Sequence, residues 1–462
     1  SRGLGDVYKR QHIDKWAFIN LDLIDELFEK RKRCAIVIGG ATSSGKSYSA
    51  EYLENFLNKN NIPSLIISTD HYNKGISGIV TDKVNEKYFN SKMPHKEEIR
   101  LIVREIIKNT PFEEKFSDEN CLKIKSKISN LLSPKELNIY LNGCKDEFSH
   151  FSFDEPYVYD LKEVAHDVKI LLSGKSITQK KYSKITSERI PNNVKIDGSK
   201  YKVIIIEGIY VLTNGLLDEL DKKYLIANFV EGTPKSLFLR RVIRDQKITS
   251  LPGYLTISMY FNYIAKSYKE SIQPSMKNAD VILDNNMSFA ELREGTLYMT
   301  KERTKITNPD FLSKLWNASK TVKTVYQKDI YIKGNGEPSD VNSIIRMREL
   351  SDDKGKTYKP SSLVSKGVPK YRRDMKEIRP INILLSEQDF PKVFTSEEDF
   401  LNKVKCADFV VQQIIYKTKR YLRYKGFKLV LTEIPNDGIY LELTDPRIDS
   451  KTRDFLLNKA TK

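Results

Sequence analysis

Residues 36–49 read IVIGGATSSGKSYS, and this stretch decides the fold of the first half of the chain. The apolar run that starts at Cys34 is continuous, which is typical of a buried parallel strand. Apolar residues recur at helical spacing after it, at Ala50, Leu53 and Phe56. A strand, a loop with the pattern G-x-x-x-x-G-K-S and a helix, in that order, predict a phosphate-binding P-loop.

The loop residues have distinct expected roles. Backbone amides and the positive end of the helix would point at nucleotide phosphates. Lys46 would reach the outer phosphate oxygens, and the Ser47 hydroxyl would bind Mg²⁺. The expected nucleotide-binding residues are Gly40, Ala41, Thr42, Ser43, Ser44, Gly45, Lys46 and Ser47.

Composition narrows the class of protein. The chain has 462 residues, 39% hydrophobic and 30% charged, which suffices for two or three domains. No apolar run approaches the roughly 18 residues of a membrane helix, and no secretory signal is evident. The four cysteines lack C-x-x-C spacing, so neither disulfides nor zinc are expected and a cytoplasmic location fits best.

The formal net charge is +17. Most lysines are dispersed, which argues against nucleic acid as a partner and leaves two readings, a solvated surface or sites for polyphosphate. Association of the chain into a homo-oligomer is possible on the sequence alone.

The chain divides into segments with different patterns. Residues 1–33 would be a leader and a helix, with 1–11 resembling translated adapter or a disordered arm. We expect a P-loop domain at 34–295, in which residues 76–150 form an insertion with two amphipathic helices. That insertion is a lid, a partner surface or a self-contained decoration. A linker at 296–325, a second domain at 326–450 and a tail at 451–462 would follow.

Two acids follow apolar strands. Asp70 comes after SLIIST, and Glu207 ends the run VIII. Open α/β sheets place ligands at the carboxyl ends of strands. Asp70 could therefore accept a proton from a hydroxyl, although a helix cap or a surface position is an alternative, and Glu207 could hold magnesium or its water.

A helix is expected after Thr233 and Pro234, because the first is a good cap and the second suits a first helical turn. It carries Arg241 and Arg244, which could close over transferring phosphates or lie on a solvated face.

These pieces, in this order, resemble the uridine kinase and phosphoribulokinase family of P-loop kinases. The resemblance rests on FDEPYVYD from Phe153, on the segment ending KYSKITSER, on VIIIEGI and on SIQPSMKNADVILDN. It implies a parallel sheet with helices on both faces, with ATP and Mg²⁺ as cofactors. It also implies that Asp70 is the general base, with Lys46, Arg241 and Arg244 as the other catalytic residues. The implied acceptor pocket is Phe153, Asp154, Tyr182 and Arg189, and the implied magnesium-side residues are Ser47 and Glu207.

Three departures from the family pattern concern activity. Ser187 stands where the family has a histidine, and Ser183 replaces an aspartate. The arginines expected after RRVIRDQK are replaced by ITSLPG, and one such arginine can contribute about 10³-fold or more in rate.

The second half carries cations at period two on successive expected strands. SIIRMRE places Arg346 and Arg348 on one strand face, and IIYKTKRYL does the same for Lys417 and Lys419. A barrel with a charged interior would accommodate them, whereas alternating solvent-facing charge is the simpler alternative.

This pattern resembles the CYTH or triphosphate-tunnel family, which implies a mainly antiparallel barrel. The implied phosphate ligands are Arg346, Arg348, Lys366, Arg373, Lys417 and Lys419, and Glu442 is the implied metal ligand. The family's other acids are thinned, with DIYIK and LTEI in place of richer acidic motifs, so binding is better supported than hydrolysis.

Three functions follow as hypotheses. The first is an ATP-dependent phosphotransferase acting on a nucleoside-like hydroxyl. The second is hydrolysis of pyrophosphate or a triphosphate in the tunnel, with a supporting P-loop domain. The third is a catalytically weak nucleotide sensor.

Overall fold

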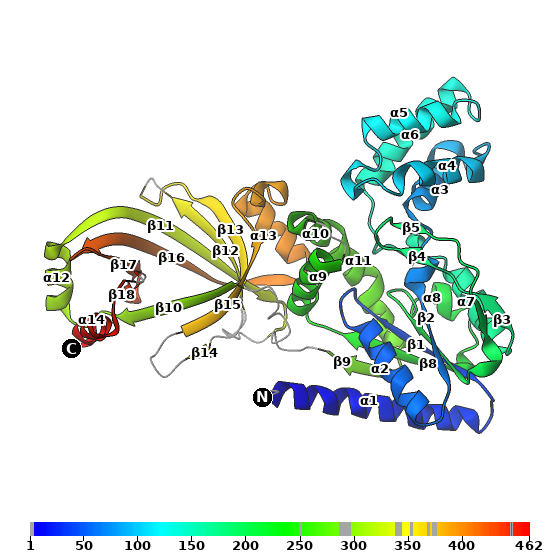
Figure 1. Cartoon of the computed structure of the whole chain (residues 1–462), viewed down its shortest axis with the longest axis horizontal. Helices are drawn as coiled ribbons and strands as arrows, with labels where there is room; N and C mark the ends of the chain where they lie inside the picture. The colour runs from blue at the N-terminus through cyan, green and yellow to red at the C-terminus, as the bar shows by residue number, and fades with distance from the viewer. Residues whose placement is uncertain are drawn as a thin grey trace. The chain divides into compact units, whose positions relative to one another are not determined.

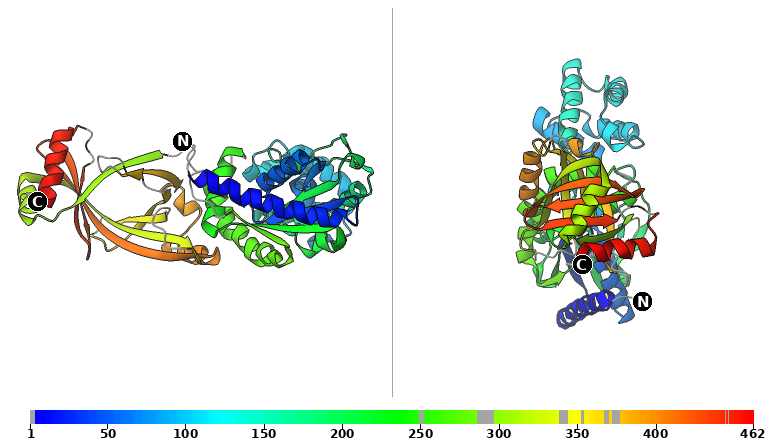
Figure 2. Two further views of the ribbon diagram at one scale, coloured as in Figure 1. Left: turned by 90° about the horizontal axis from the view of Figure 1, so that it is seen from below. Right: turned by 90° about the vertical axis from the view of Figure 1, so that its left-hand side faces the viewer.

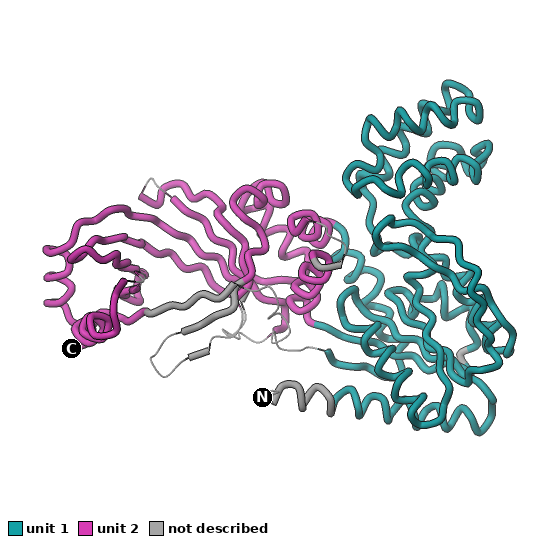
Figure 3. The backbone as a smooth tube through the Cα atoms, in the orientation of Figure 1, with its two compact units in different colours: residues 1–232, 263–286 teal, residues 233–262, 287–462 magenta. Residues whose placement is uncertain are grey.

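The computed structural model describes residues 4–248, 252–285, 297–337, 344–351, 354–366, 370–371, 377–443, 445 and 447–462. The chain forms two compact units, coloured separately in Figure 3. Unit 1 comprises residues 1–232 and 263–286, and unit 2 comprises residues 233–262 and 287–462.

Unit 1 is built on a five-stranded parallel sheet (Figure 1). Its order is β2 (Ser64–Ser68), β7 (Val203–Glu207), β1 (Cys34–Gly40), β8 (Leu225–Glu231) and β9 (Val281–Asp284). The helices of unit 1 include α1 (Leu4–Phe28), α2 (Lys46–Lys59), α3 (Ile76–Phe89), α4 (Lys96–Ile107), α5 (Asp118–Ile128), α6 (Pro134–Ser149), α7 (Leu161–Leu172), α8 (Asn214–Leu217) and α11 (Ala265–Ser267). The expected parallel α/β architecture is confirmed.

The two faces of this sheet bury alternate residues of β1. Ile36 and Ile38 lie in a core with the apolar residues of α1 and α2. Ala35 and Val37 lie in the opposite core, to which α7 contributes. Both faces are thus covered, which explains the continuous apolar run in the sequence.

Helix α1 lies beside α2 along one side of unit 1 (Figure 2), and polar side chains fix it to the sheet. Trp16 Nε1 donates to Asn228 Oδ1 at 2.7 Å, and Asn20 Nδ2 donates to the same oxygen at 3.0 Å. The helix begins at Leu4, so residues expected to be a disordered leader are helical from that point.

The insertion holds four described helices, α3 to α6, where the sequence predicted two. Ile99, Val103 and Ile107 of α4 are fully buried in the larger core of unit 1. A short 3-10 turn, η1 (Thr69–Tyr72), leads from β2 towards the insertion. Two small antiparallel pairs follow α7, namely β3 (Ser176–Thr178) with β6 (Lys195–Asp197) and β4 (Tyr182–Ser183) with β5 (Glu188–Arg189).

Unit 2 contains an antiparallel sheet of nine described strands. They are β10 (Leu297–Lys305), β11 (Ser319–Gly334), β12 (Ile344–Ser351), β13 (Lys359–Lys366), β14 (Lys370–Tyr371), β15 (Glu377–Leu385), β16 (Phe409–Tyr424), β17 (Phe427–Ile434) and β18 (Gly438–Leu443). Strand β10 pairs with β18 and also with β15. The helices are α9 (Pro234–Ile248), α10 (Gly253–Met259), α12 (Pro309–Ala318), α13 (Glu397–Cys406) and α14 (Ser450–Thr461).

The observed elements differ from the expected segment bounds in three places. The segment 296–325, expected to be a linker, holds β10, α12 and the start of β11. The expected tail is helix α14, whose Leu456 and Ala460 are buried against strands of unit 2. Helix α9 groups with unit 2 rather than with the parallel sheet. Among the described residues, no helix is both long enough and apolar enough to cross a membrane.

Candidate active site

The loop after β1 has the backbone conformation of a phosphate cradle. Gly40 and Gly45 have φ values of 141° and 101°, and Ser43 has φ of 61°. A Cβ atom at Gly40 would lie 2.4 Å from the carbonyl oxygen of Val230. Glycine is therefore required at Gly40 by both conformation and space.

Polar atoms inside this loop fit a bound phosphate. The buried hydroxyl oxygens of Ser43 and Ser44 have no hydrogen-bond partner among the described residues. Buried polar groups are usually paired, so a ligand that accepts hydrogen bonds would satisfy them. Lys46 Nζ donates to the carbonyl oxygen of Ala41 at 2.6 Å, which folds the ammonium group back over the loop.

Glu207 lies between the phosphate loop and the end of β2. Its carboxylate accepts from Ser47 Oγ at 3.2 Å and also from the Ser68 hydroxyl. Burial raises the pKa of Glu207, and the negative charge of Asp70 raises it further, while Lys46 opposes both. A cation placed here would favour the ionised form of Glu207, so Ser47 and Glu207 fit a magnesium ion.

No cluster of three or more His, Cys, Asp or Glu suited to a metal occurs in the described parts of the chain. A magnesium ion at Ser47 and Glu207 would therefore need phosphate oxygens and water to complete its shell, as is usual for Mg²⁺.

Asp70 is in the η1 turn, and its side chain does not cap that turn. Ser68 is the N-cap, and its hydroxyl accepts from the backbone amide of Asp70 at 3.3 Å. The Asp70 carboxylate lies 2.8 Å from Lys184 Nζ. Its side chain is about one-third exposed, at 37%. The carboxylate is thus partly accessible and is paired with a lysine that the sequence motifs do not indicate.

The Phe153–Asp154 segment is held tightly. Asp154 is buried, and its carbonyl oxygen accepts hydrogen bonds from the Tyr210 and Ser267 hydroxyls, both at 2.5 Å. Phe153 packs edge-on against Phe151 with ring centroids 4.8 Å apart. The Phe153 ring also packs against Phe112 of the insertion, with ring centroids 5.8 Å apart.

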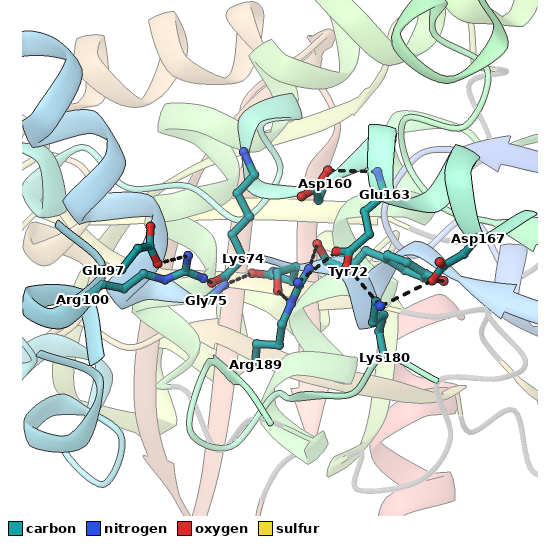
Figure 4. A network of polar contacts seen from close by, with 11 residues as sticks. Tyr72, Lys74, Gly75, Glu97, Arg100, Asp160, Glu163, Asp167, Lys180 and Arg189 are labelled. Carbon is teal, nitrogen blue, oxygen red and sulfur yellow. Dashed lines mark hydrogen bonds and ion pairs between the residues drawn. The ribbon is translucent and has the colours of Figure 1, made fainter. Parts of the chain in front are cut away.

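Arg189 acts as a clamp on the chain that follows Asp70 (Figure 4). Its guanidinium donates to the carbonyl oxygens of Tyr72 and Asn73 at 3.1 and 3.3 Å. It also binds Glu163 at 2.9 Å. Arg189 thereby positions the backbone next to the candidate base, a role that its place in the sequence motif did not indicate.

Tyr182 lies across the small ladder from Arg189. Burial raises the pKa of the Tyr182 phenol, and the charges of Glu188 and Asp70 also raise it. Tyr182 therefore lies close enough to Asp70, the candidate base, for the charge of Asp70 to affect the Tyr182 phenol.

Arg241 and Arg244 belong to α9 of unit 2 and meet at one acid. Arg241 Nε lies 2.5 Å from Asp245 Oδ2, and Arg244 Nη2 lies 2.8 Å from Asp245 Oδ1. Asp245 is buried, so this carboxylate holds both guanidinium groups within unit 2.

In unit 2 the cations of β12 and β16 converge on buried acids. Arg348 binds Asp329 through two bonds of 2.7 and 3.0 Å, and Lys417 Nζ lies 2.6 Å from the same carboxylate. Arg346 Nε is 3.8 Å from Asp329 and has no hydrogen-bond partner among the described residues. Three neighbouring strands, β12, β11 and β16, thus bring these cations together around one carboxylate.

Lys419 and Glu442 form a second pair on this face. Their side chains are 3.1 Å apart, and Thr432 donates to Glu442 at 2.8 Å. Burial lowers the pKa of Lys419, as do the nearby charges of Arg348 and Lys417. Strand register places Lys366 on the same face as Arg346, since Ile344 pairs with Lys366 and Arg346 with Val364. Arg373 lies outside the described residues.

Comparison with known proteins finds a family match over part of the chain. Residues 126–289 match the model of the Phosphoribulokinase / Uridine kinase family. A uridine kinase of Staphylococcus epidermidis is 29% identical over 133 residues, which are 29% of this chain and 61% of that protein. A uridine kinase of Staphylococcus aureus is 29% identical over 139 residues, 30% of this chain and 64% of that protein. The chain therefore matches just over three-fifths of the length of these relatives.

Solved structures show a weaker likeness. The structure of a "Possible Uridine Kinase" from Bacillus stearothermophilus has 14% identity and a TM-score of 0.32, covering 60% of this chain and 100% of its own. The PH1819 protein from Pyrococcus horikoshii OT3 has 13% identity and a TM-score of 0.25, covering 35% of this chain and 85% of its own. Values at this level carry no argument about function.

Proposed function

We propose that unit 1 is an ATP-dependent phosphotransferase of the uridine kinase type, which phosphorylates a hydroxyl group of a nucleoside-like acceptor. The observation that carries this proposal is the meeting of three groups at one edge of the sheet. Glu207 is in register with Ile38 of β1 and with Ser68 of β2. The phosphate loop, the magnesium-side acid and the turn that holds Asp70 therefore start from adjacent strand ends, where α/β sheets bind ligands.

The reaction would use these residues in separate roles. The loop amides and Lys46 bind and orient the phosphates of ATP, and Ser47 with Glu207 holds Mg²⁺. Bound Mg²⁺ supplies positive charge that offsets the charge of the phosphate oxygens.

Asp70 accepts the proton of the acceptor hydroxyl as the hydroxyl oxygen bonds to the γ-phosphorus and the bond from that phosphorus to the bridging oxygen breaks, which releases ADP. Lys184 pairs with the Asp70 carboxylate and so lies next to the proposed proton acceptor. The acceptor would lie against Phe153, Asp154 and Tyr182.

The departures at Ser187 and in the segment 248–253 bear on substrate and rate. A serine in place of histidine removes one side chain that could hydrogen-bond to a nucleobase. Arg241 and Arg244 would have to leave Asp245 to stabilise a transferring phosphoryl group, because that carboxylate holds both of them.

The test is transfer of the labelled γ-phosphate of ATP to a panel of nucleosides, with pyrophosphate and tripolyphosphate as further acceptors or substrates. Transfer to a nucleoside by the full chain, and loss of ATP binding in Lys46→Ala, would support the proposal. ATP affinity that is unchanged in Lys46→Ala would remove the nucleotide site from unit 1.

For unit 2 we propose a CYTH-like polyphosphate-binding barrel, favoured by the convergence of cations on Asp329 and Glu442. The ladder between β10 and β15 would close the sheet, with this face inside. One alternative is hydrolysis of pyrophosphate or a triphosphate in unit 2, and a second alternative is a catalytically weak nucleotide sensor. Binding is favoured because lysine and arginine already hold both acids, and two-metal hydrolysis needs acids that are available to metal.

A further inference from the structure

The segment 182–189 carries several residues of the candidate acceptor side. Tyr182 and Arg189 pair across the β4–β5 ladder, and Lys184 in the turn between these strands lies 2.8 Å from Asp70. Each strand of this ladder has two residues, and isolated hairpins are at best marginally stable even when they are longer. Other parts of the chain must therefore hold the segment in place.

The start of the insertion holds one side of this segment. Ser187 has a φ of 57°, a left-handed conformation that persists in a residue with a side chain only where neighbouring contacts fix it. The backbone amide of Ile76, the first residue of α3, donates to the carbonyl oxygen of Ser187 at 3.0 Å. The buried Glu188 carboxylate accepts from the amide and hydroxyl of Ser77 at 2.8 and 2.7 Å.

Lys115 holds the same turn from a distant part of the insertion. It follows the short turn η2 (Phe112–Glu114), and only 1% of its surface is exposed. Its Nζ donates to the carbonyl oxygen of Thr186 at 3.1 Å and to that of Ile107, the last residue of α4, at 2.8 Å. One buried ammonium group thus joins the insertion to the turn that holds Lys184.

A buried lysine is unfavourable unless its ammonium group is paired. Burial lowers the pKa of Lys115, and the charge of Glu188 opposes that change. An apolar side chain would fill this space without the cost of burying a charge. The presence of a lysine therefore indicates that its hydrogen bonds to the two carbonyl oxygens are needed.

We propose that Lys115 is a positioning residue, which fixes the turn at residues 184–187 so that Lys184 and Tyr182 lie correctly beside Asp70. The insertion then serves as a brace for the acceptor side of unit 1, a role that differs from a lid, a partner surface and a self-contained decoration. The effect on the reaction rests on the proposed phosphotransferase, whereas the bracing of the segment does not.

Hydrogen exchange of the full chain, followed by mass spectrometry, tests the bracing. Lys115→Met removes the ammonium group and keeps a long unbranched side chain. The amides of segment 182–190 should exchange about tenfold faster in this variant, because a charge-assisted hydrogen bond is lost. The amides of α7 are the internal reference and should exchange at the parental rate, since a loss of overall stability would affect both regions.

Lys123→Met is the matched control. Lys123 lies on α5 of the insertion, is exposed and pairs with Glu119 at 2.6 Å. This variant should leave the exchange of segment 182–190 unchanged. If Lys115→Met does not fold, Lys115→Gln takes its place with the same expected result, because the shorter side chain cannot bridge both carbonyl oxygens.

Phosphate transfer tests the role in the reaction. Lys115→Met should lower kcat/KM for the nucleoside acceptor about tenfold and leave KM for ATP within about twofold, because Lys115 contacts the acceptor side. The proposal is overturned if segment 182–190 exchanges at the parental rate, if α7 exchanges faster to the same degree, or if kcat/KM for the acceptor keeps its parental value. If the parent transfers no phosphate but the exchange results hold, the proposed phosphotransferase fails and the bracing of the segment stands.

Discussion

Asparagine in place of Asp329 would leave three cations of unit 2 without their shared counter-ion. Asp329 is fully buried, and Arg348, Lys417 and Arg346 surround its carboxylate at 2.7, 2.6 and 3.8 Å. Burial alone would raise the pKa of Asp329, but Arg348, Arg346 and Lys417 outweigh burial and hold it far below its usual range. The carboxylate is therefore ionised in the folded protein and offsets the repulsion among these cations.

The expected cost follows from burial. Removing one partner of a buried ion pair costs about 3–5 kcal/mol. Arg348 and Lys417 keep some access to water, which places the expected loss near the lower value, about 3 kcal/mol. A change of 1 kcal/mol moves the midpoint of a unit of this size by roughly 2–4 °C, so Asp329→Asn should lower its transition by roughly 6–12 °C.

Scanning calorimetry of the full chain, with and without tripolyphosphate, measures this effect. The added anion should raise the transition of Asp329→Asn more than that of the parent, because it replaces the lost charge. Acid should remove the difference between the two proteins. The stabilisation due to Asp329 is complete above the ordinary carboxyl pKa of about 4 and is lost as the pH falls below it. Equal transitions at neutral pH, or equal responses to tripolyphosphate, would refute the reasoning.

Three further predictions concern unit 1. Burial raises the pKa of Glu188 to about 7, so the folded protein holds this proton more tightly than the unfolded chain does, and the free energy of unfolding should fall as the pH rises from about 4.5 to 7. Glu188→Gln should flatten this pH dependence in urea titrations at several pH values, and an unchanged dependence would show that the Glu188 carboxyl is not its cause. Ser47→Ala should raise the Mg²⁺ concentration needed for ATP binding, measured by calorimetry at fixed ATP, and an unchanged requirement would exclude this hydroxyl as a ligand. Arg189→Lys should destabilise unit 1 by about 2–3 kcal/mol in urea unfolding, because one ammonium cannot make the three contacts of the clamp, and parental stability would contradict the clamp.

Local signals made the phosphate loop predictable from the sequence. The glycines, Lys46 and Ser47 are consecutive or nearly so, and the apolar run before them requires a strand that is buried on both faces. Asp70 and Glu207 were placed by the same logic, since Asp70 comes shortly after β2 and Glu207 is the last residue of β7.

Contacts between distant segments were not predictable in this way. Lys184 meets Asp70 through the small β4–β5 ladder, and no spacing in the sequence indicates that pairing. Helix α9 follows a strand of unit 1 but groups with unit 2, because Phe238 packs against Phe409 of that unit. The segment of β10 was predicted to be a linker because its residues are mostly polar. It forms a strand because its backbone pairs with β15 and β18, which are distant in the sequence.

Phosphate transfer by Asp70→Asn, compared with the parent, tests the central claim most directly. The substitution keeps the size of the side chain and removes the proton acceptor beside Lys184. With labelled ATP and the best nucleoside acceptor of the panel, we predict that ATP affinity stays within about twofold and that transfer falls about 10²-fold or more. Transfer at the parental rate by Asp70→Asn, or no transfer by the parent to any acceptor, would contradict the account.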